Sequence, residues 1–84
     1  MDNLFAVTHL ILYTTSACSA CEEALERILA LGDPGVRTLV TRDVADDERL
    51  FERYATRVPV LSYRGTELDW PFGECDMRRL LHGG

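Results

Sequence analysis

The first half of the chain opens with a short apolar strand and an amphipathic helix. Thr8–Tyr13 is a nearly continuous run of apolar, β-branched and aromatic residues, which is typical of a central strand covered on both faces. Behind the turn at 14–16, apolar residues recur at the i, i+3, i+4 and i+7 positions of one helical face, namely Cys21, Ala24, Leu25 and Ile28. Gly32 ends this predicted helix, because glycine adopts the left-handed cap conformation and Pro34 cannot continue a helix.

A second strand and a second helix follow. Val36–Val44 places apolar residues among threonines and arginines, a pattern that indicates a strand with an exposed edge. Asp46 is predicted to begin the next helix, because the acidic residues there suit the positive N-terminal end of a helix dipole. Pro59 requires this helix to end before it.

The last third of the chain predicts a β-hairpin and a terminal helix. Residues 60–63 and 66–69 have strand composition, and Gly65 between them supplies the positive φ of a tight turn. A helix from near Gly73 to His82 has an apolar side at Met77, Leu80 and Leu81. The order is therefore β-α-β-α-β-β-α. Its βαβ opening gives two parallel strands, and the hairpin adds an antiparallel pair to the same sheet. The predicted fold is therefore an α/β fold with one mixed sheet, and helices must cover both faces of that sheet.

Composition indicates one globular domain that spans residues 1–84. Of the 84 residues, 46% are hydrophobic and 27% are charged, and no low-complexity tract suggests a linker. The net charge is −5, and all nine basic residues are arginines. We see no basic stripe of the kind that neutralises phosphates, so nucleic acid is not an expected partner.

No membrane span or export signal is predicted. The most apolar stretch, Leu4–Tyr13, is far shorter than the roughly 20 residues that a bilayer requires. Met1–Asn3 lacks the basic start of a secretory signal peptide. Three cysteines are few for a disulfide-stapled secreted domain, and in a reducing compartment a paired set is more often catalytic or metal-binding. We therefore expect a cytoplasmic protein.

A pair of cysteines, Cys18 and Cys21, lies at the start of the predicted first helix. Two thiols at this spacing can close a small disulfide, and the unpaired N–H groups of a helix N-terminus stabilise a thiolate on the first of them. Cys21 shares the apolar face of the helix and should be partly buried, whereas Cys18 lies at the helix mouth. Disulfide exchange needs an exposed nucleophile and a second thiol. These positions predict that Cys18 attacks and that Cys21 resolves the mixed disulfide.

Few candidate metal ligands remain. A structural zinc or iron–sulfur site needs about four ligands, but only Cys75, His9 and His82 are left and the sequence has no second CxxC, so no metal site is predicted within one chain. Cys75, in the first turn of the last helix, is expected to face the core. His82 is expected to complement the dipole at the end of that helix.

Four stretches of the chain carry a resemblance to known proteins. They are Tyr13–Cys21 with its CxxC, Asp43–Val44, Tyr54–Leu61 with its Val-Pro pair, and Glu67–Phe72. The chain resembles the thioredoxin-fold superfamily and the glutaredoxins within it, and most narrowly the small bacterial glutaredoxin-like proteins. The likeness runs from about Thr8 to Leu81.

The resemblance implies a four-stranded sheet in the order 4-3-1-2, with strand three antiparallel to the rest and a cis peptide bond before Pro59. It also implies a thiol-disulfide oxidoreductase in which the backbone of Val58, beside Pro59, holds an extended substrate. Arg57, on the same loop, is the predicted cation beside Cys18. The expected partners are protein or small-molecule disulfides and either glutathione, as a co-substrate, or a thioredoxin-type reductase. No resident cofactor is expected, and the chain is expected to be a monomer.

Two departures from typical glutaredoxins bear on glutathione. Ser19–Ala20 stands where those proteins have an aromatic residue between the cysteines, and Thr15 stands where they often have a lysine. Glu74 replaces a glycine ahead of the last helix, where its charge disfavours a bound carboxylate. The alternative interpretation is a non-enzymatic binding module, or an iron–sulfur or other metal-binding protein that shares the metal between chains, with the same cysteines as tether or ligands.

Overall fold

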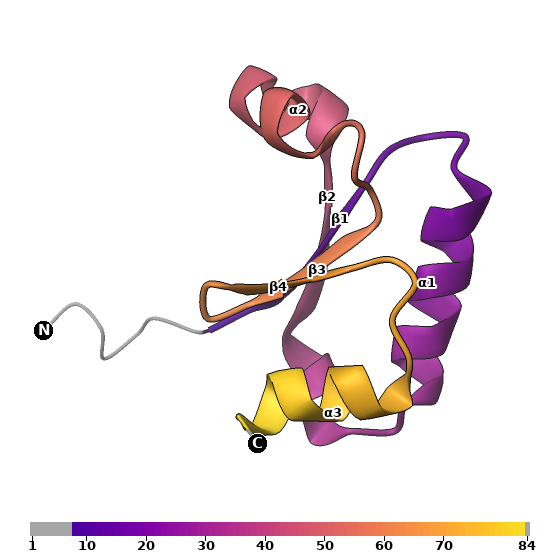
Figure 1. Cartoon of the computed structure of the whole chain (residues 1–84), viewed down its shortest axis with the longest axis vertical. Coiled ribbons are helices and arrows are strands. Elements are labelled where there is room, and N and C mark those ends of the chain that lie inside the picture. The colour runs from indigo at the N-terminus through magenta and orange to yellow at the C-terminus, as the bar shows by residue number, and fades with distance from the viewer. Residues whose placement is uncertain (1–7, 84) are drawn as a thin grey trace, which may run out of the picture.

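Four strands form one mixed sheet at the centre of the computed structural model, which describes residues 8–83 (Figure 1). The strands are β1 (Leu10–Thr14), β2 (Leu39–Asp43), β3 (Val60–Tyr63) and β4 (Thr66–Asp69). The α-helices are α1 (Ser19–Ala30), α2 (Glu48–Tyr54) and α3 (Glu74–His82), and two short 3-10 helices are η2 (Pro34–Thr38) and η3 (Val44–Asp46). Apart from these 3-10 turns, the element order is the predicted one.

The sheet has the order β2-β1-β3-β4. β1 and β2 are parallel, while β3 is antiparallel to both β1 and β4. This is the predicted order 4-3-1-2 counted from the opposite edge, so the predicted topology is confirmed. Leu12 of β1 lies opposite Thr41 of β2 and Leu61 of β3, which places β1 at the centre of the sheet.

The two faces of the sheet carry separate clusters of buried side chains, because neighbouring residues of a strand point to opposite faces. Helices α1 and α3 pack on one face, over the cluster Leu10, Leu12, Ala24, Ile28, Leu31, Leu61, Phe72 and Met77. Helix α2 packs on the other face with the smaller cluster Val44, Tyr54 and Val60. Helices therefore cover both faces, as predicted (Figure 1).

Local capping moves two predicted boundaries. The second strand begins at Leu39 and not at Val36, because the carboxylate of Asp33 accepts the N–H of Gly35 at 2.8 Å and starts the 3-10 helix η2. The second helix begins after Asp47, whose side chain caps it by accepting the N–H groups of the first helical turn. The predicted start at Asp46 was therefore wrong, since that residue belongs to η3. The first strand begins at Leu10, slightly later than predicted.

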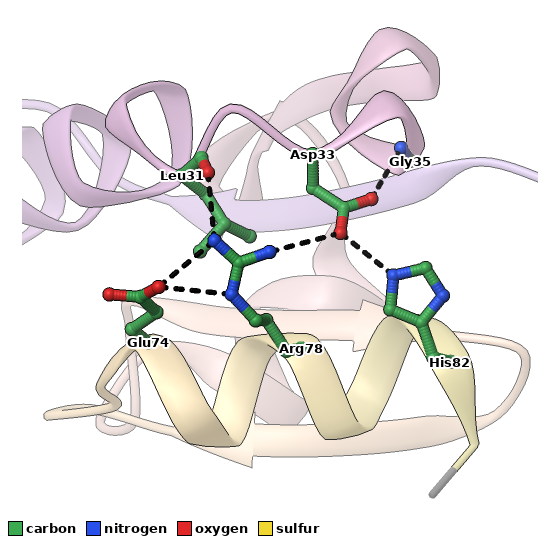
Figure 2. Close-up of polar contacts among 6 residues, drawn as sticks. All are labelled: Leu31, Asp33, Gly35, Glu74, Arg78 and His82. Carbon is green, nitrogen blue, oxygen red and sulfur yellow. Dashed lines mark hydrogen bonds and ion pairs between the residues drawn. The ribbon is translucent and has the colours of Figure 1, made fainter.

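A buried carboxylate joins the end of α1 to α3 (Figure 2). The Asp33 side chain is only 3% exposed; its Oδ2 lies 2.7 Å from Nε2 of His82 and 3.5 Å from the guanidinium of Arg78. Arg78 also donates to the carbonyl of Leu31 at 3.2 Å and pairs with Glu74 at 2.9 Å. The hydrogen bond from His82, followed by that from the Gly35 backbone, lowers the pKa of Asp33 below its usual value. His82 thus pairs with a carboxylate as well as lying in the last turn of α3.

Within residues 8–83, no helix is long and apolar enough to cross a membrane. The predictions made for Met1–Asn3 and for the first residues of the apolar stretch, Leu4–Val7, lie outside the described residues.

Candidate active site

The two cysteines are joined as a disulfide across the first turn of α1. Cys18 is the N-cap residue of the helix, and the chain turns into it through Ala17, whose φ is 54°. The Cys18 Sγ accepts the backbone N–H of Cys21 at 3.1 Å, and its carbonyl oxygen accepts the N–H of Glu22 at 3.2 Å. The N-terminus of a 12-residue helix is therefore aimed at the first sulfur.

The two cysteines differ in exposure, as the helical spacing predicts. Cys21 is 4% exposed, on the face of α1 that also buries Ala24 and Ile28. Cys18 is half-buried at the helix mouth. An incoming disulfide therefore reaches Cys18 more readily than Cys21, and this difference is the geometric basis for assigning unequal roles to the two thiols.

The Val58–Pro59 pair lies at the same end of the sheet as the cysteines. Val60, the first residue of β3, is paired with Tyr13 near the end of β1, and the chain continues from there into the cysteine loop (Figure 1). The Val58–Pro59 peptide bond is cis, so the expectation drawn from the resemblance is confirmed. Pro59 itself is buried, while Val58 is half-buried. The Trp70–Pro71 bond is also cis, which the sequence analysis did not anticipate.

Arg57 has different partners from the one predicted. Its Nη2 donates to Oε1 of Glu67 at 2.9 Å and to Oδ1 of Asp69 at 2.9 Å. The two acceptors are alternate residues of β4, so they share one face of the strand, and their hydrogen bonds raise the pKa of Arg57. Two carboxylates within hydrogen-bond distance thus hold the guanidinium. The structure therefore corrects the predicted pairing of Arg57 with Cys18.

A tyrosine network behind the Val58–Pro59 loop was missed by the sequence analysis. The ring of Tyr54 stacks on that of Tyr13 at 4.1 Å between centroids, and the Tyr54 hydroxyl donates to Oε2 of Glu67 at 2.6 Å. Glu67 therefore connects the end of α2, through Tyr54, to the loop residue Arg57. The alternation of acidic residues along β4 was the available signal, because it places both carboxylates on the face that α2 covers.

A small cavity opens beside the disulfide, between the start of α1 and strand β2. Its volume is about 230 Å³, and it is lined by residues 14–17, Cys18, Cys21, Glu22, Leu25 and Thr41. We call it the hydroxyl pocket, because four of its lining residues carry a hydroxyl group: Thr14, Thr15, Ser16 and Thr41. Neither Val58 nor Pro59 is among the lining residues, so the hydroxyl pocket lies apart from the loop that precedes β3.

Cys75 is exposed and unpaired within the described part of the chain, so the expectation that it faces the core was wrong. Met77 is the buried residue of α3, and two helical positions correspond to a rotation of about 200°, which turns Cys75 toward solvent. Over residues 8–83, no group of three or more His, Cys, Asp or Glu side chains converges in a way that could hold a metal ion.

The sheet topology and the cysteine spacing define a small thioredoxin-fold protein whose first helix begins at a CxxC pair. Residues 9–82 match the model of the glutaredoxin-like domain (DUF836) family, and the chain belongs to this family. The chain is also similar to a solved structure, the X-ray structure of a structural-genomics target protein from X. campestris. The two are 37% identical with a TM-score of 0.74, over 89% of this chain and 97% of the other. A search of curated proteins gave no match.

Proposed function

We propose that this protein is a thiol-disulfide oxidoreductase that acts as a cytoplasmic monomer on protein or small-molecule disulfides. The observation that carries the proposal is the Cys18–Cys21 pair, which closes a disulfide across the first turn of α1 with one half-buried and one buried sulfur. Membership in the glutaredoxin-like family and the buried Pro59 at the same end of the sheet support it.

The reaction is a pair of thiol-disulfide exchanges. The Cys18 thiolate attacks one sulfur of the substrate disulfide, forms a mixed disulfide, and releases the other half as a thiolate that takes up a proton. Cys21 loses its proton to solvent and attacks the Sγ of Cys18, which forms the Cys18–Cys21 disulfide and releases the second half of the substrate as a thiol. Two electrons have then passed to the substrate. Two equivalents of glutathione, or a thioredoxin-type reductase, return them to the protein.

The chain's own groups would assist both exchanges. The N–H of Cys21 lies 3.1 Å from the Cys18 Sγ, where it can donate to a thiolate. We propose that the backbone of Val58, beside Pro59, pairs with an extended substrate segment. Arg57 would then contribute by fixing this loop through Glu67 and Asp69 rather than by contact with the reacting sulfur.

The proposal is tested by reducing hydroxyethyl disulfide with the purified protein and by trapping the intermediate. Cys21→Ser should stop at a mixed disulfide on Cys18, visible as a mass increase that dithiothreitol removes, and Cys18→Ser should abolish turnover. Cys75→Ser is the matched control, because that exposed thiol lies outside the proposed site and its loss should leave the rate unchanged.

Two results would contradict the proposal. One is a Cys18–Cys21 pair that never oxidises in a glutathione redox buffer, and the other is full activity of Cys18→Ser. Iron that co-purifies after anaerobic isolation and depends on the same cysteines would favour the shared-cluster alternative.

A further inference from the structure

The hydroxyl pocket lies directly against the reactive sulfur and has a distinct chemistry. Cys18 and Cys21 both line it, so whatever is attached to a sulfur that approaches Cys18 from this side enters the hydroxyl pocket. Its volume of about 230 Å³ equals that of about eight water molecules in the liquid. A group of a few non-hydrogen atoms fits this space.

The side-chain charge among the residues that line the hydroxyl pocket is negative. Glu22 is the charged residue that lines it, and no arginine within residues 8–83 does so. Glu22 also has no ion-pair partner within those residues, unlike its neighbour Glu23, which pairs with Arg27 at 3.3 Å. The chain contains no lysine, and Arg57 is held by two carboxylates. Arg42 follows Thr41 on β2, so its side chain leaves the opposite face of the strand and does not line the hydroxyl pocket.

The remaining lining groups are suited to a polar cation. Hydroxyl oxygens of serine and threonine accept hydrogen bonds from an ammonium group, which has donors and no acceptor. The Leu25 side chain provides an apolar wall for a short alkyl chain. Glu22 meanwhile stands in the same helical turn as Cys21, where its charge opposes the Cys18 thiolate. The hydroxyl pocket therefore favours a cationic group and repels an anionic one.

We propose that the hydroxyl pocket is a specificity subsite for small aminothiol disulfides, in which Glu22 attracts an ammonium group attached near the sulfur under attack. The inference rests on the proposed disulfide exchange and names its substrate class. Cystamine has the required chemistry: each half carries one ammonium group on a short alkyl chain. Disulfides that carry a carboxylate in the same position, such as dithiodiglycolate, are the disfavoured class.

The test is a single-turnover reaction of the fully reduced protein with three small disulfides that differ in charge. The probes are cystamine (cationic), hydroxyethyl disulfide (neutral) and dithiodiglycolate (anionic). The Cys18–Cys21 dithiol is oxidised while each probe is reduced to two thiols, so no added reductant is needed. Acid quenching, alkylation and mass spectrometry give the second-order rate constants. Each rate constant is divided by that for hydroxyethyl disulfide, which removes any change in the general reactivity of Cys18.

Glu22→Gln should lower the relative rate for cystamine about two- to fivefold and raise that for dithiodiglycolate by a similar factor, the range expected for a partly exposed ion pair. Both effects should fade at 1 M salt, where the screening length falls to about 3 Å. Glu23→Gln is the matched control: it makes the same change in net charge one residue away, outside the hydroxyl pocket, and should leave the relative rates unchanged.

Equal relative rates in the wild type and in Glu22→Gln would overturn the subsite. A shift in Glu23→Gln as large as that in Glu22→Gln would also overturn it, because the preference would then follow net charge alone. Failure of the proposed function looks different: no probe, including the neutral one, would oxidise the cysteine pair.

Discussion

The hydrogen bond from Tyr54 to Glu67 helps to hold the Val58–Pro59 loop, because Glu67 also accepts a hydrogen bond from Arg57 of that loop. The hydroxyl lies 2.6 Å from the carboxylate, and Tyr54 is 4% exposed. Burial, followed by the hydrogen bond to Glu67, raises the pKa of Tyr54 above its usual value, so the hydroxyl stays protonated at neutral pH. The same hydrogen bond and, to a smaller extent, the hydrogen bond from Arg57 lower the pKa of Glu67. Each group therefore stabilises the other in the state that it has at pH 7.

Tyr54→Phe removes the hydroxyl and keeps the ring that stacks on Tyr13. A hydrogen bond to a charged acceptor contributes about 1.5–3 kcal/mol. Glu67 keeps its bond to Arg57 at 2.9 Å, and its side chain is 21% exposed, so water can partly replace the lost donor. We therefore expect the lower end of the range, a loss of about 1.5 kcal/mol. In a domain of this size the corresponding fall in Tm is about 6–12 °C.

The assay is urea unfolding at pH 7, followed by the fluorescence of Trp70, with the disulfide intact. Tyr63→Phe is the matched control, because the Tyr63 hydroxyl makes no hydrogen bond within residues 8–83, and it should lose far less stability. The stabilisation by the Glu67 charge is present above pH 4.5, its unperturbed pKa, and is lost as pH falls through the lower folded value. The gap between wild type and Tyr54→Phe should therefore narrow on acidification. Equal losses in both variants, or a gap independent of pH, would refute the reasoning.

Two further predictions concern stability away from the cysteines. Asp33→Asn should lower the Tm at pH 7, because it replaces the buried carboxylate that bonds His82. The folded pKa of Asp33 lies below 3.8, so this loss of Tm should shrink as pH falls below that value. A Tm difference that does not change with pH would contradict a stabilising role of the Asp33 charge. Gly65→Ala should lower the free energy of unfolding in urea by about 1 kcal/mol, because φ is 82° and no neighbour lies near an added Cβ. Gly65→Asn should lower it less, because asparagine tolerates the left-handed conformation better than alanine. Equal losses in the two variants would show that backbone conformation is not the cause.

The order of elements followed from the sequence because the hydrophobic period changes clearly from strand to helix. The apolar spacing of α1 and α3, the proline before β3 and the glycine in the β3–β4 turn each gave a local signal that agreed with the fold. The region before β2 misled the prediction, because Val36 belongs by composition to a strand but lies in a 3-10 helix started by Asp33. Which of two competing local structures forms depends there on a tertiary contact, the pairing of Asp33 with α3.

At the candidate site, the sequence predicted the arrangement of the two cysteines better than their surroundings. Cys18 and Cys21 are neighbours on one helical turn, so their relation follows from the spacing alone. The partners of Arg57 depend on the β3–β4 hairpin, which returns Glu67 and Asp69 to the loop from further along the chain. A sequence pattern shows that an arginine is available near the site but not which of several carboxylates or thiolates will hold it.

In the proposed mechanism, the hydrogen bonds of Arg57 to Glu67 and Asp69 explain how one site would stabilise a thiolate and still disfavour anionic substrates. A guanidinium beside Cys18 would attract the thiolate and any carboxylate of the substrate alike. Backbone N–H groups act differently, because a dipole's field falls off faster with distance than that of a charge, and the helix terminus acts mainly within its first turn. The N–H of Cys21 at 3.1 Å can therefore stabilise charge on the Cys18 sulfur, while Glu22 sets the sign of the field in the hydroxyl pocket beyond it.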